Sequence, residues 1–410
     1  MKKKYIGIVI LALILLGFIL FFSSHKPSDI HLLDDNSIDI SDSLKQTLQT
    51  DLKKKSESLQ PIIQKDAMNG TRKNISTPAL SKAGVKAIYE KLLDENSCVN
   101  DEQGYYDLQG RDHFLSFWKD YQAKKDTKLT HYTISSTGGI RRDDFIYQDN
   151  VLYLISISLY YDNGKAIISD TNGWKIEKAD YDTYGYFSYK KIVLEKPFDL
   201  GDITNGYFRV DPMDETLRTY TNTYITPIEY DCNNLFVMDW DENSVDKLCF
   251  NDLVEYLYPI EHQQAIPENY MKDSGQQYIS YIDANVFEDL VHRYFTIDNA
   301  ILRSQNYYCE TQHAYPYAEL YCIASHVATP RLRPEVVKAQ KEKNILTLTI
   351  HATGYEKGYP VAYTHIVKIE LLDDGSYHYI SNHIVPDNNN QIPKYTPGIT
   401  NKSQKEGGCL

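Results

Sequence analysis

The chain has 410 residues, and its composition is that of a folded protein rather than a disordered or fibrous one. Hydrophobic residues make up 42% of it and charged residues 24%, which is enough of both for a buried core and a solvated surface. The formal net charge of -13 argues against nucleic acid as a partner, because two polyanions repel each other. At about 150 residues per domain, the length suggests two domains.

An apolar run without a charged residue extends from Tyr5 to Phe22. As a helix it would be about 27 Å long, close to the hydrocarbon thickness of a bilayer. A cleaved signal peptide is the alternative, but its apolar region is usually about 7 to 15 residues and ends in small residues. We therefore predict an uncleaved transmembrane signal anchor over residues 1–22. The three lysines at positions 2–4 place the N-terminus in the cytoplasm and the rest of the chain outside.

Residues 23–75 are polar and almost free of aromatic side chains, which predicts a linker. Leucines spaced as on one face of an amphipathic helix lie within it, at Leu44, Leu48, Leu52 and Leu59. One interpretation is a dimerising stalk, although four leucines are too few for a sustained heptad repeat. The other interpretation is a surface helix or a partly ordered linker.

A first α+β domain is predicted over residues 76–200. Ser76-Thr77-Pro78 is a typical helix start, and Asp112 is a candidate N-cap for a second helix that carries aromatic residues at helical spacing. The hydrophobic period then changes from 3.6 to 2 over residues 151–160, which indicates a strand. Two sequences predict the hairpin turns of an antiparallel meander, Gln148-Asp149-Asn150 and Asp162-Asn163-Gly164.

A second α+β domain, over residues 201–396, repeats the order of helices followed by strands. Ser244 and Asp283 are the predicted N-caps of two amphipathic helices. Strands are expected at residues 346–352, 363–371 and 377–384, the last two joined by the turn Asp373-Asp374-Gly375. Each domain is therefore expected to lay helices on one face of an antiparallel sheet. The polar residues 397–410 predict a flexible tail.

Four runs in the chain resemble an uncharacterised family of membrane-anchored or secreted proteins of Gram-positive bacteria. The runs are Asn100–Gly110 (NDEQGYYDLQG), Gly138–Tyr147 (GGIRRDDFIY), Leu248–Tyr258 (LCFNDLVEYLY) and Ile392–Thr396 (IPKYT). The resemblance implies an extracytoplasmic location and carries no activity or site residue. Members that are lipoproteins would have an early cysteine, whereas this chain has none before Cys98.

Motifs of the common enzyme classes are absent from the sequence: it contains no G-x-S-x-G, H-E-x-x-H, G-x-x-x-x-G-K-[ST] or G-x-G-x-x-G. Ser188-Tyr189-Lys190-Lys191 matches S-x-x-K, but it lies in a strand-like run rather than at a helix start. Asp239, Asp241 and Asn243 match the first three positions of a calcium loop that then lacks its glycine and its bidentate glutamate. We predict no catalytic, cofactor-binding or metal-binding residue.

Six histidines lie in the last hundred residues: His313, His326, His351, His365, His378 and His383. Imidazoles on adjacent strands could bind zinc. Strand alternation, however, puts His351 and His365 on opposite faces of the sheet and separates His378 from His383 in the same way. Only a bulge would reset this parity. We therefore predict that no three of these strand histidines share one ion.

Two cysteine pairs, Cys232 with Cys249 and Cys309 with Cys322, would close loops of 18 and 14 residues if oxidised. Each bridge would contribute about 3 kcal/mol in the chain-entropy model. Cys249 falls on the apolar stripe of a predicted helix, where a free thiol is the ordinary outcome. We predict no more than one of the two bridges.

Tyrosine is unusually common, with 35 residues against 13 phenylalanines and 3 tryptophans. Exposed tyrosines could stack on wall sugars or bind extended peptides. Tyrosine is also favoured in sheets, where its ring can be buried while its hydroxyl contacts water, so a structural role is the stronger interpretation.

These observations favour a single-pass membrane protein whose extracytoplasmic region binds or senses an envelope protein, peptide or glycan without catalysis. The alternative is an extracytoplasmic hydrolase of wall material, with site residues drawn from the C-terminal histidines and the Asp239 region. A third hypothesis is a structural protein that dimerises through residues 44–59. No cofactor is expected under the leading hypothesis, and the oligomeric state is left open.

Overall fold

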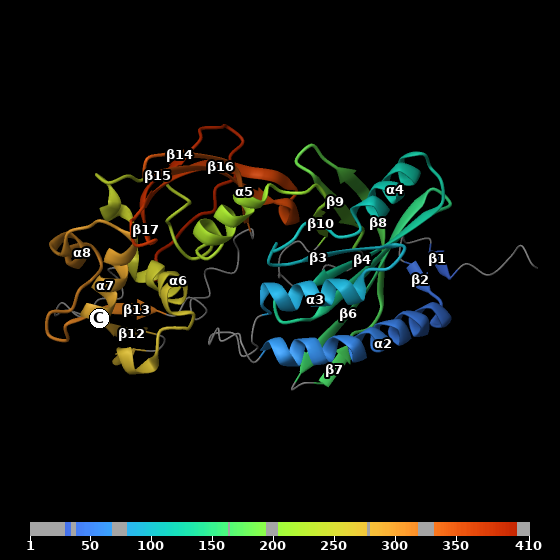
Figure 1. Ribbon diagram of the computed structural model, residues 1–410, viewed down its shortest axis with the longest axis horizontal. Coiled ribbons are helices and arrows are strands. Elements are labelled where there is room, and N and C mark those ends of the chain that lie inside the picture. Colours follow the sequence, from blue (N-terminus) through green and yellow to red (C-terminus); the bar gives the residue numbers. More distant parts are fainter. Residues whose placement is uncertain are drawn as a thin grey trace, which may run out of the picture.

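The computed structural model describes residues 29–33, 38–67, 80–162, 165–193, 204–276, 279–318 and 332–399. The apolar run at residues 5–22, the Ser76-Thr77-Pro78 pattern, His326, Cys322 and most of the predicted tail lie outside this description. Within it, no helix is long and apolar enough to cross a membrane. The described chain forms a mixed α+β fold with several sheets, as predicted, and its two units lie side by side along the long axis (Figure 1).

The first unit is built on a long, curled sheet. Its strand order is β10 (Asn205–Arg209), β9 (Tyr186–Lys191), β8 (Asn172–Tyr181), β6 (Val151–Asp162), β5 (Ile140–Gln148), β4 (Thr127–Ile134) and β3 (Ser97–Asp101), with β7 (Lys165–Ile168) paired to β6. The predicted strand at residues 151–160 is confirmed in β6. The sheet is not a pure antiparallel meander, because β3 runs parallel to β4. It also extends past residue 200 through β10, beyond the predicted end of the domain.

The hairpin between β5 and β6 follows from local turn chemistry. Asp149 and Asn150 have φ angles of 53° and 62°, the left-handed conformation that a two-residue hairpin turn requires and that these residue types tolerate. The predicted turn at residues 148–150 is therefore confirmed.

Helices cover both faces of this sheet. One face carries α2 (Asp42–Ala67) and α3 (Lys82–Leu92), and the other carries α4 (Arg111–Gln122), as Figure 1 shows. The helix α3 begins after Ser81, whose hydroxyl accepts from the Gly84 N–H at 3.1 Å. The prediction for α4 was wrong by two residues, because Gly110 is its N-cap and Asp112 lies in its first turn.

The helix predicted within the linker at residues 23–75 belongs to the first unit's core. Leu48, Leu52 and Leu59 on α2 are at most 2% exposed and join the same buried cluster as Ile155 of β6. The stalk interpretation is therefore wrong, because the leucine face that would form a dimer seam is already covered by the chain's own sheet.

The second unit combines helices with a four-stranded antiparallel sheet, and the short helix α5 (Glu215–Tyr220) packs on an edge strand of this sheet. The sheet consists of β14 (Arg333–Glu342), β15 (Ile345–Gly354), β16 (Tyr359–Leu371) and β17 (Tyr377–Ile384), in that order. Of the other helices, α6 (Phe250–His262) and α7 (Ala284–Tyr294) pack on a small sheet of β11 (Met271–Gln276), β12 (Ile279–Asp283) and β13 (Ala314–Ala318), and α8 (Asn299–Gln305) packs on the 3-10 turn at Val245–Lys247. All three predicted strands are confirmed, whereas β14 was not predicted.

The two predicted helix caps of the second unit had different outcomes. Asp283 does cap α7, since its side chain accepts from the Asn285 N–H. Ser244 does not cap α6: it precedes a short 3-10 turn at Val245–Lys247, and the helix begins only after Cys249.

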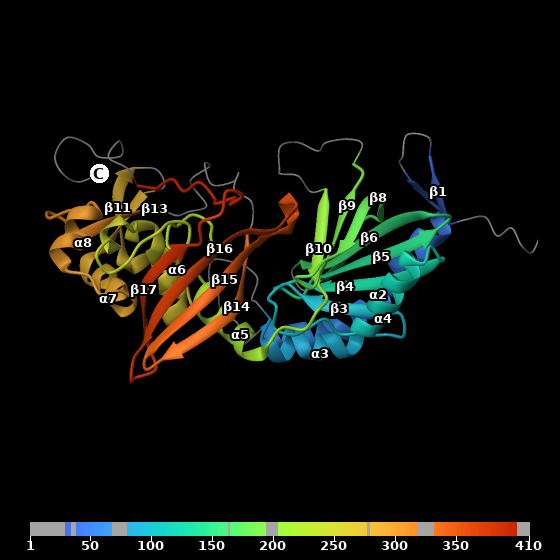
Figure 2. The same ribbon diagram turned by 90° about the horizontal axis from the view of Figure 1, so that it is seen from above.

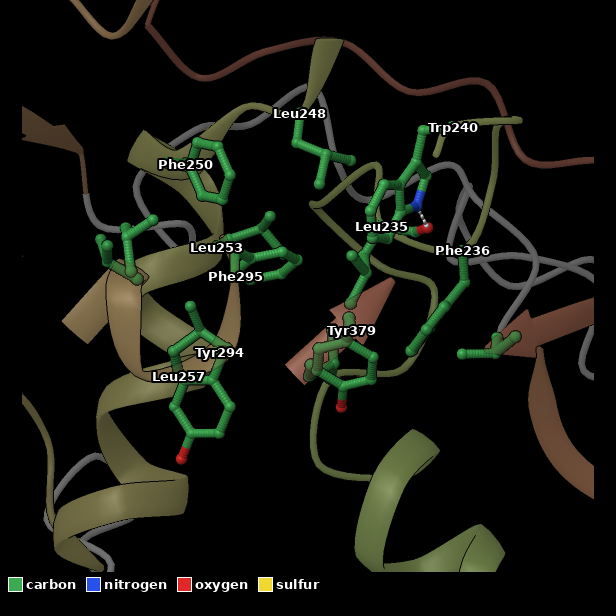
Figure 3. Packing of buried hydrophobic residues seen from close by; sticks show 14 of the residues in the cluster. Leu235, Phe236, Trp240, Leu248, Phe250, Leu253, Leu257, Tyr294, Phe295 and Tyr379 are labelled. Atoms are coloured by element: carbon green, nitrogen blue, oxygen red, sulfur yellow. Dashed lines mark hydrogen bonds between the residues drawn. The ribbon is translucent and has the colours of Figure 1, made fainter. Parts of the chain in front are cut away.

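The core of the second unit joins the helices to the sheet through aromatic side chains. Figure 3 shows Phe295 between Phe250 of α6 and Tyr379 of β17, with Trp240 close by on an irregular segment. The Trp240 indole donates to the Leu235 carbonyl at 2.8 Å, which satisfies its buried N–H. Residues 226–249, which contain little regular structure, are thus held by core side chains and by the backbone pairing of Trp240 with Asn382 of β17.

Candidate functional site, a polar cluster inside the curled sheet

A charged pair of strands crosses the interior of the first unit. His131 of β4 and Asp143 of β5 lie directly opposite each other in the ladder, and they are 1% and 2% exposed. They share the α4 face with Leu129 and Phe145, because side chains two residues apart on a strand point the same way. A buried carboxylate and an imidazole among aromatic side chains require polar partners.

His131 is neutral, and only one of its two ring nitrogens has a hydrogen-bond partner. Its Nε2 lies 2.9 Å from Oδ1 of Asn100, and its ring stacks on Phe208 with centroids 3.9 Å apart. Burial, followed by the positive charge of Arg141, lowers the pKa of His131 well below its usual value. Its Nδ1 has no hydrogen-bond partner and lies 4.0 Å from Oδ2 of Asp143, too far for a direct hydrogen bond.

A second polar atom beside His131 is also unsatisfied. The hydroxyl of Thr133, two residues further along the same face of β4, is buried and has no hydrogen-bond partner. Most buried polar groups in folded proteins do have one, so two such atoms on one face need an explanation, for example a bound water molecule or another polar group.

Arg141 closes the cluster on the solvent side. Its Nε donates to Oδ2 of Asp143 at 2.9 Å, and this carboxylate raises the pKa of Arg141. The Arg141 side chain is nevertheless 48% exposed, so the guanidinium reaches from the buried carboxylate to solvent. Lys191 lies near the same groups: burial lowers its pKa, Asp143 opposes that effect and Arg141 adds to it. We call His131, Thr133, Arg141, Asp143 and Lys191 the β4–β5 cluster.

The second unit borders this cluster. Nη1 of Arg333, at the start of β14, donates to the Glu102 carbonyl at 3.0 Å. Tyr207 of β10 raises the pKa of Arg333, so its phenol lies close to that guanidinium. Both Glu102 and Tyr207 also act electrostatically on residues of the first unit, Arg141 among them. Arg141 of the cluster therefore lies near the contact between the two units.

Tyrosines and ion pairs form the junction between the units. Glu335 of β14 accepts from the Tyr186 hydroxyl at 2.6 Å and pairs with Arg209 at 2.5 Å. The rings of Tyr186 and Tyr207 stack on Tyr355 with centroids 4.6 and 5.2 Å away. Strand β10 and the 3-10 turn Tyr355–Lys357 are thus in direct contact (Figure 2).

Exposed tyrosines do not gather into one face in the part of the chain that the structure describes. The most exposed ones, at 38–49%, lie on separate elements and are Tyr160, Tyr184, Tyr270 and Tyr359. Many others belong to the core or to the junction, in line with the structural interpretation of their abundance.

His365 is a fully satisfied core histidine. Its Nδ1 lies 2.7 Å from Oδ1 of Asn382 and its Nε2 lies 3.0 Å from the Tyr230 hydroxyl. Burial lowers its pKa to about 4. His351 projects from the opposite face of the sheet, as predicted, because His365 pairs with Ile350 and His351 pairs with Thr364.

The prediction that His378 and His383 lie on opposite faces was wrong. A bulge in β17 leaves Ile380 without a partner, so that Lys368 pairs with Ser381 while Ile369 pairs with Tyr379. The extra residue resets the alternation and puts both histidines on the outer face. They have different neighbours there: His378 lies beside Thr296 and His383 beside Asp239.

Asp239 and Asp241 serve as local hydrogen-bond acceptors. Asp239 accepts from the Ile384 N–H at 2.6 Å, and Asp241 accepts from the Asn243 N–H and from the Ser244 hydroxyl. Among the described residues, no group of three histidine, cysteine or carboxylate side chains is placed to hold a metal ion. Ser188 of the S-x-x-K match lies within strand β9 and faces Tyr207 in the ladder.

The described cysteines include three free thiols and one disulfide-bonded residue. Cys98, Cys232 and Cys249 are free, so the pair Cys232 and Cys249 is not bridged. Burial raises the pKa of both these thiols to about 12. Cys309 is disulfide-bonded.

The sequence contains a signal for the charged residues of the β4–β5 cluster. The run Arg141-Arg142-Asp143-Asp144 stands between Ile140 and Phe145 in a strand, so each face of the sheet receives one arginine and one aspartate two residues apart. Four charges inside an apolar strand point to a buried ionic arrangement.

The fold and this site define a two-unit α+β protein with a polar cluster enclosed by its first sheet. The chain belongs to a family of unknown function, DUF6070, whose model matches residues 45–398. The matched range begins within α2 and ends at the segment that follows β17, so it covers both units. No curated protein and no solved structure matches the chain.

Proposed function

We propose that this protein is anchored in the membrane by residues 5–22 and binds or senses a small polar ligand outside the cytoplasm of a Gram-positive cell, without catalysis. The apolar run and the lysines before it support the anchor and its orientation. The disulfide at Cys309 supports an oxidising compartment, since such bonds are rare in cytosolic proteins.

The observation that carries the binding role is the pair of unsatisfied atoms in the β4–β5 cluster. A hydrogen-bond donor placed beside Nδ1 of His131 would give this acceptor the partner it lacks, next to the Asp143 carboxylate that already accepts from Arg141. Arg141 adds a partly exposed guanidinium that suits a carboxylate or phosphate. The ligand class is therefore a small molecule with hydroxyl or amine donors and an anionic group.

The chemistry of the other candidates favours binding over catalysis. Cys232 and Cys249 have raised thiol pKa values, whereas a nucleophilic cysteine needs a lowered one. His365 already uses both ring nitrogens in the core, so it has none for a substrate. Of the C-terminal histidines and the Asp239 region, which the hydrolase hypothesis used, His383 lies 3.2 Å from Asp239, whereas His378 lies beside Thr296 instead.

The proposed orientation has a direct test. With an epitope at the C-terminus, protease added to intact cells stripped of their wall should digest the epitope while a cytosolic marker survives. An epitope protected until lysis would contradict the outside location.

The proposed ligand class is tested with N-acetylmuramic acid, glutamate and inorganic phosphate, added singly to the purified protein. A true ligand at a hundred times its Kd should stabilise the fold by about 2.7 kcal/mol, seen as a rise in Tm. The double variant Arg141→Gln/Asp143→Asn removes the ion pair without leaving a buried charge, and it should lose this rise. An equal rise in both proteins would place the ligand elsewhere.

A further inference from the structure

The first folded element after the apolar run is a small hairpin of β1 (Ile30–Leu32) and β2 (Ile38–Ile40). Its base is closed by Ser41, whose N–H and hydroxyl donate to the Asp29 carbonyl at 2.9 Å and to the Asp29 carboxylate at 2.7 Å. In both views the hairpin lies at the end of the first unit that is remote from the second unit (Figures 1 and 2).

The hairpin is held firmly against the sheet on its inner side. Ile30 and Ile40 are 5% exposed and belong to the core cluster of α2 and α3. Ile38 packs on Gly173 of β8 so closely that a Cβ at that glycine would lie 2.4 Å from Cδ1 of Ile38. The position of the hairpin relative to the first unit is therefore defined by packing.

The outer end of the hairpin is apolar. Leu32 and Leu33 are adjacent in the chain and are 37% and 48% exposed. His31 and Asp39 beside them are also exposed, Asp34 and Asp35 follow them in the sequence, and no lysine or arginine lies in residues 29–41. An exposed leucine pair without basic neighbours suits an apolar surface rather than anionic headgroups.

Chain length brings this pair to the membrane. Only six residues separate Phe22, the end of the apolar run, from Asp29, the first described residue. A fully extended chain spans at most about 3.6 Å per residue, so Asp29 lies within about 25 Å of the end of the run. That distance is shorter than the thickness of the bilayer itself.

We propose that the β1–β2 hairpin lies on the outer leaflet of the membrane, with Leu32 and Leu33 in its interfacial region, and that the second unit is held away from the surface. This inference rests on the proposed anchor. It places the β4–β5 cluster on the membrane-proximal unit, and the contact is driven by burial of the two leucines rather than by attraction of basic residues to anionic lipid.

The test uses the full-length protein in vesicles of phosphatidylcholine and phosphatidylglycerol. Leu33→Cys is labelled with an environment-sensitive fluorophore, and Ile301→Cys on α8, which is 43% exposed at the other end of the molecule, is the matched control. The free thiols of the described residues react slowly at neutral pH, because Cys98 is buried and the pKa values of Cys232 and Cys249 are raised to about 12, and Cys409 is replaced by serine in every labelled protein.

We expect nitroxide-labelled lipid to quench the Leu33→Cys probe several-fold more strongly than the Ile301→Cys probe, at both low and high salt. Equal quenching in protein that floats with the vesicles would overturn the hairpin contact while leaving the anchor intact. Protein that does not float with the vesicles would refute the anchor, and the hairpin contact with it.

Discussion

Replacing Arg142 with alanine should lower the free energy of unfolding by about 3–5 kcal/mol, the usual cost of leaving one partner of a buried ion pair alone. Its Nη1 contacts Asp51 of α2 at 2.5 Å and its Nε contacts Asp144 at 3.1 Å. Asp144 is 1% exposed, and the alanine variant would leave it with the Thr130 hydroxyl and the more distant Lys128. Urea denaturation measures the loss.

Two further variants serve as controls for the Arg142→Ala result. Lys45→Ala removes an exposed ion pair on the same helix, with Asp42 at 3.8 Å, and should cost less than about 1 kcal/mol. The double change Arg142→Met/Asp144→Leu removes both charges and should recover most of the loss. If Arg142→Ala costs no more than Lys45→Ala, the ionic contact between α2 and the sheet does not stabilise the fold.

Acid should destabilise the protein through His365. Burial lowers the pKa of this imidazole to about 4 in the folded state, against 6.5 ordinarily. Between about pH 6.5 and pH 4, His365 is therefore protonated in the unfolded chain but still neutral in the folded chain. The neutral imidazole makes its full contribution to the free energy of unfolding above pH 6.5. This contribution is lost as the pH falls to 4, and the free energy of unfolding decreases by about 3 kcal/mol in total.

The variant His365→Gln isolates this effect, since glutamine does not titrate and can still form hydrogen bonds. The difference in unfolding free energy between the wild type and His365→Gln should be about 3 kcal/mol larger at pH 7 than at pH 4. His383→Gln controls for the removal of an exposed histidine. A difference that stays constant between these pH values would show that His365 is not held neutral by the core.

Local patterns in the sequence determined most of the elements. The alternation over residues 151–160 specifies β6, and the turn at residues 148–150 specifies its hairpin, because both depend on neighbours within a few residues. Asp283 caps α7 for the same reason. Leucine spacing likewise revealed α2, although the composition around it suggested a linker rather than a part of the core.

Long-range packing decided the rest. No local signal shows that the leucine face of α2 is covered by β6, or that a bulge at Ile380 turns His378 and His383 to one face. The curl of the sheet brings Phe208 of β10 onto His131 of β4, two strands that are not neighbours in the sheet. The spacing of Arg141 and Asp143 was legible in the sequence, but the unsatisfied atoms beside them exist only once the sheet has closed around that pair. Whether a polar group is buried and unpartnered depends on distant segments, whereas strand parity and turn geometry depend on adjacent residues.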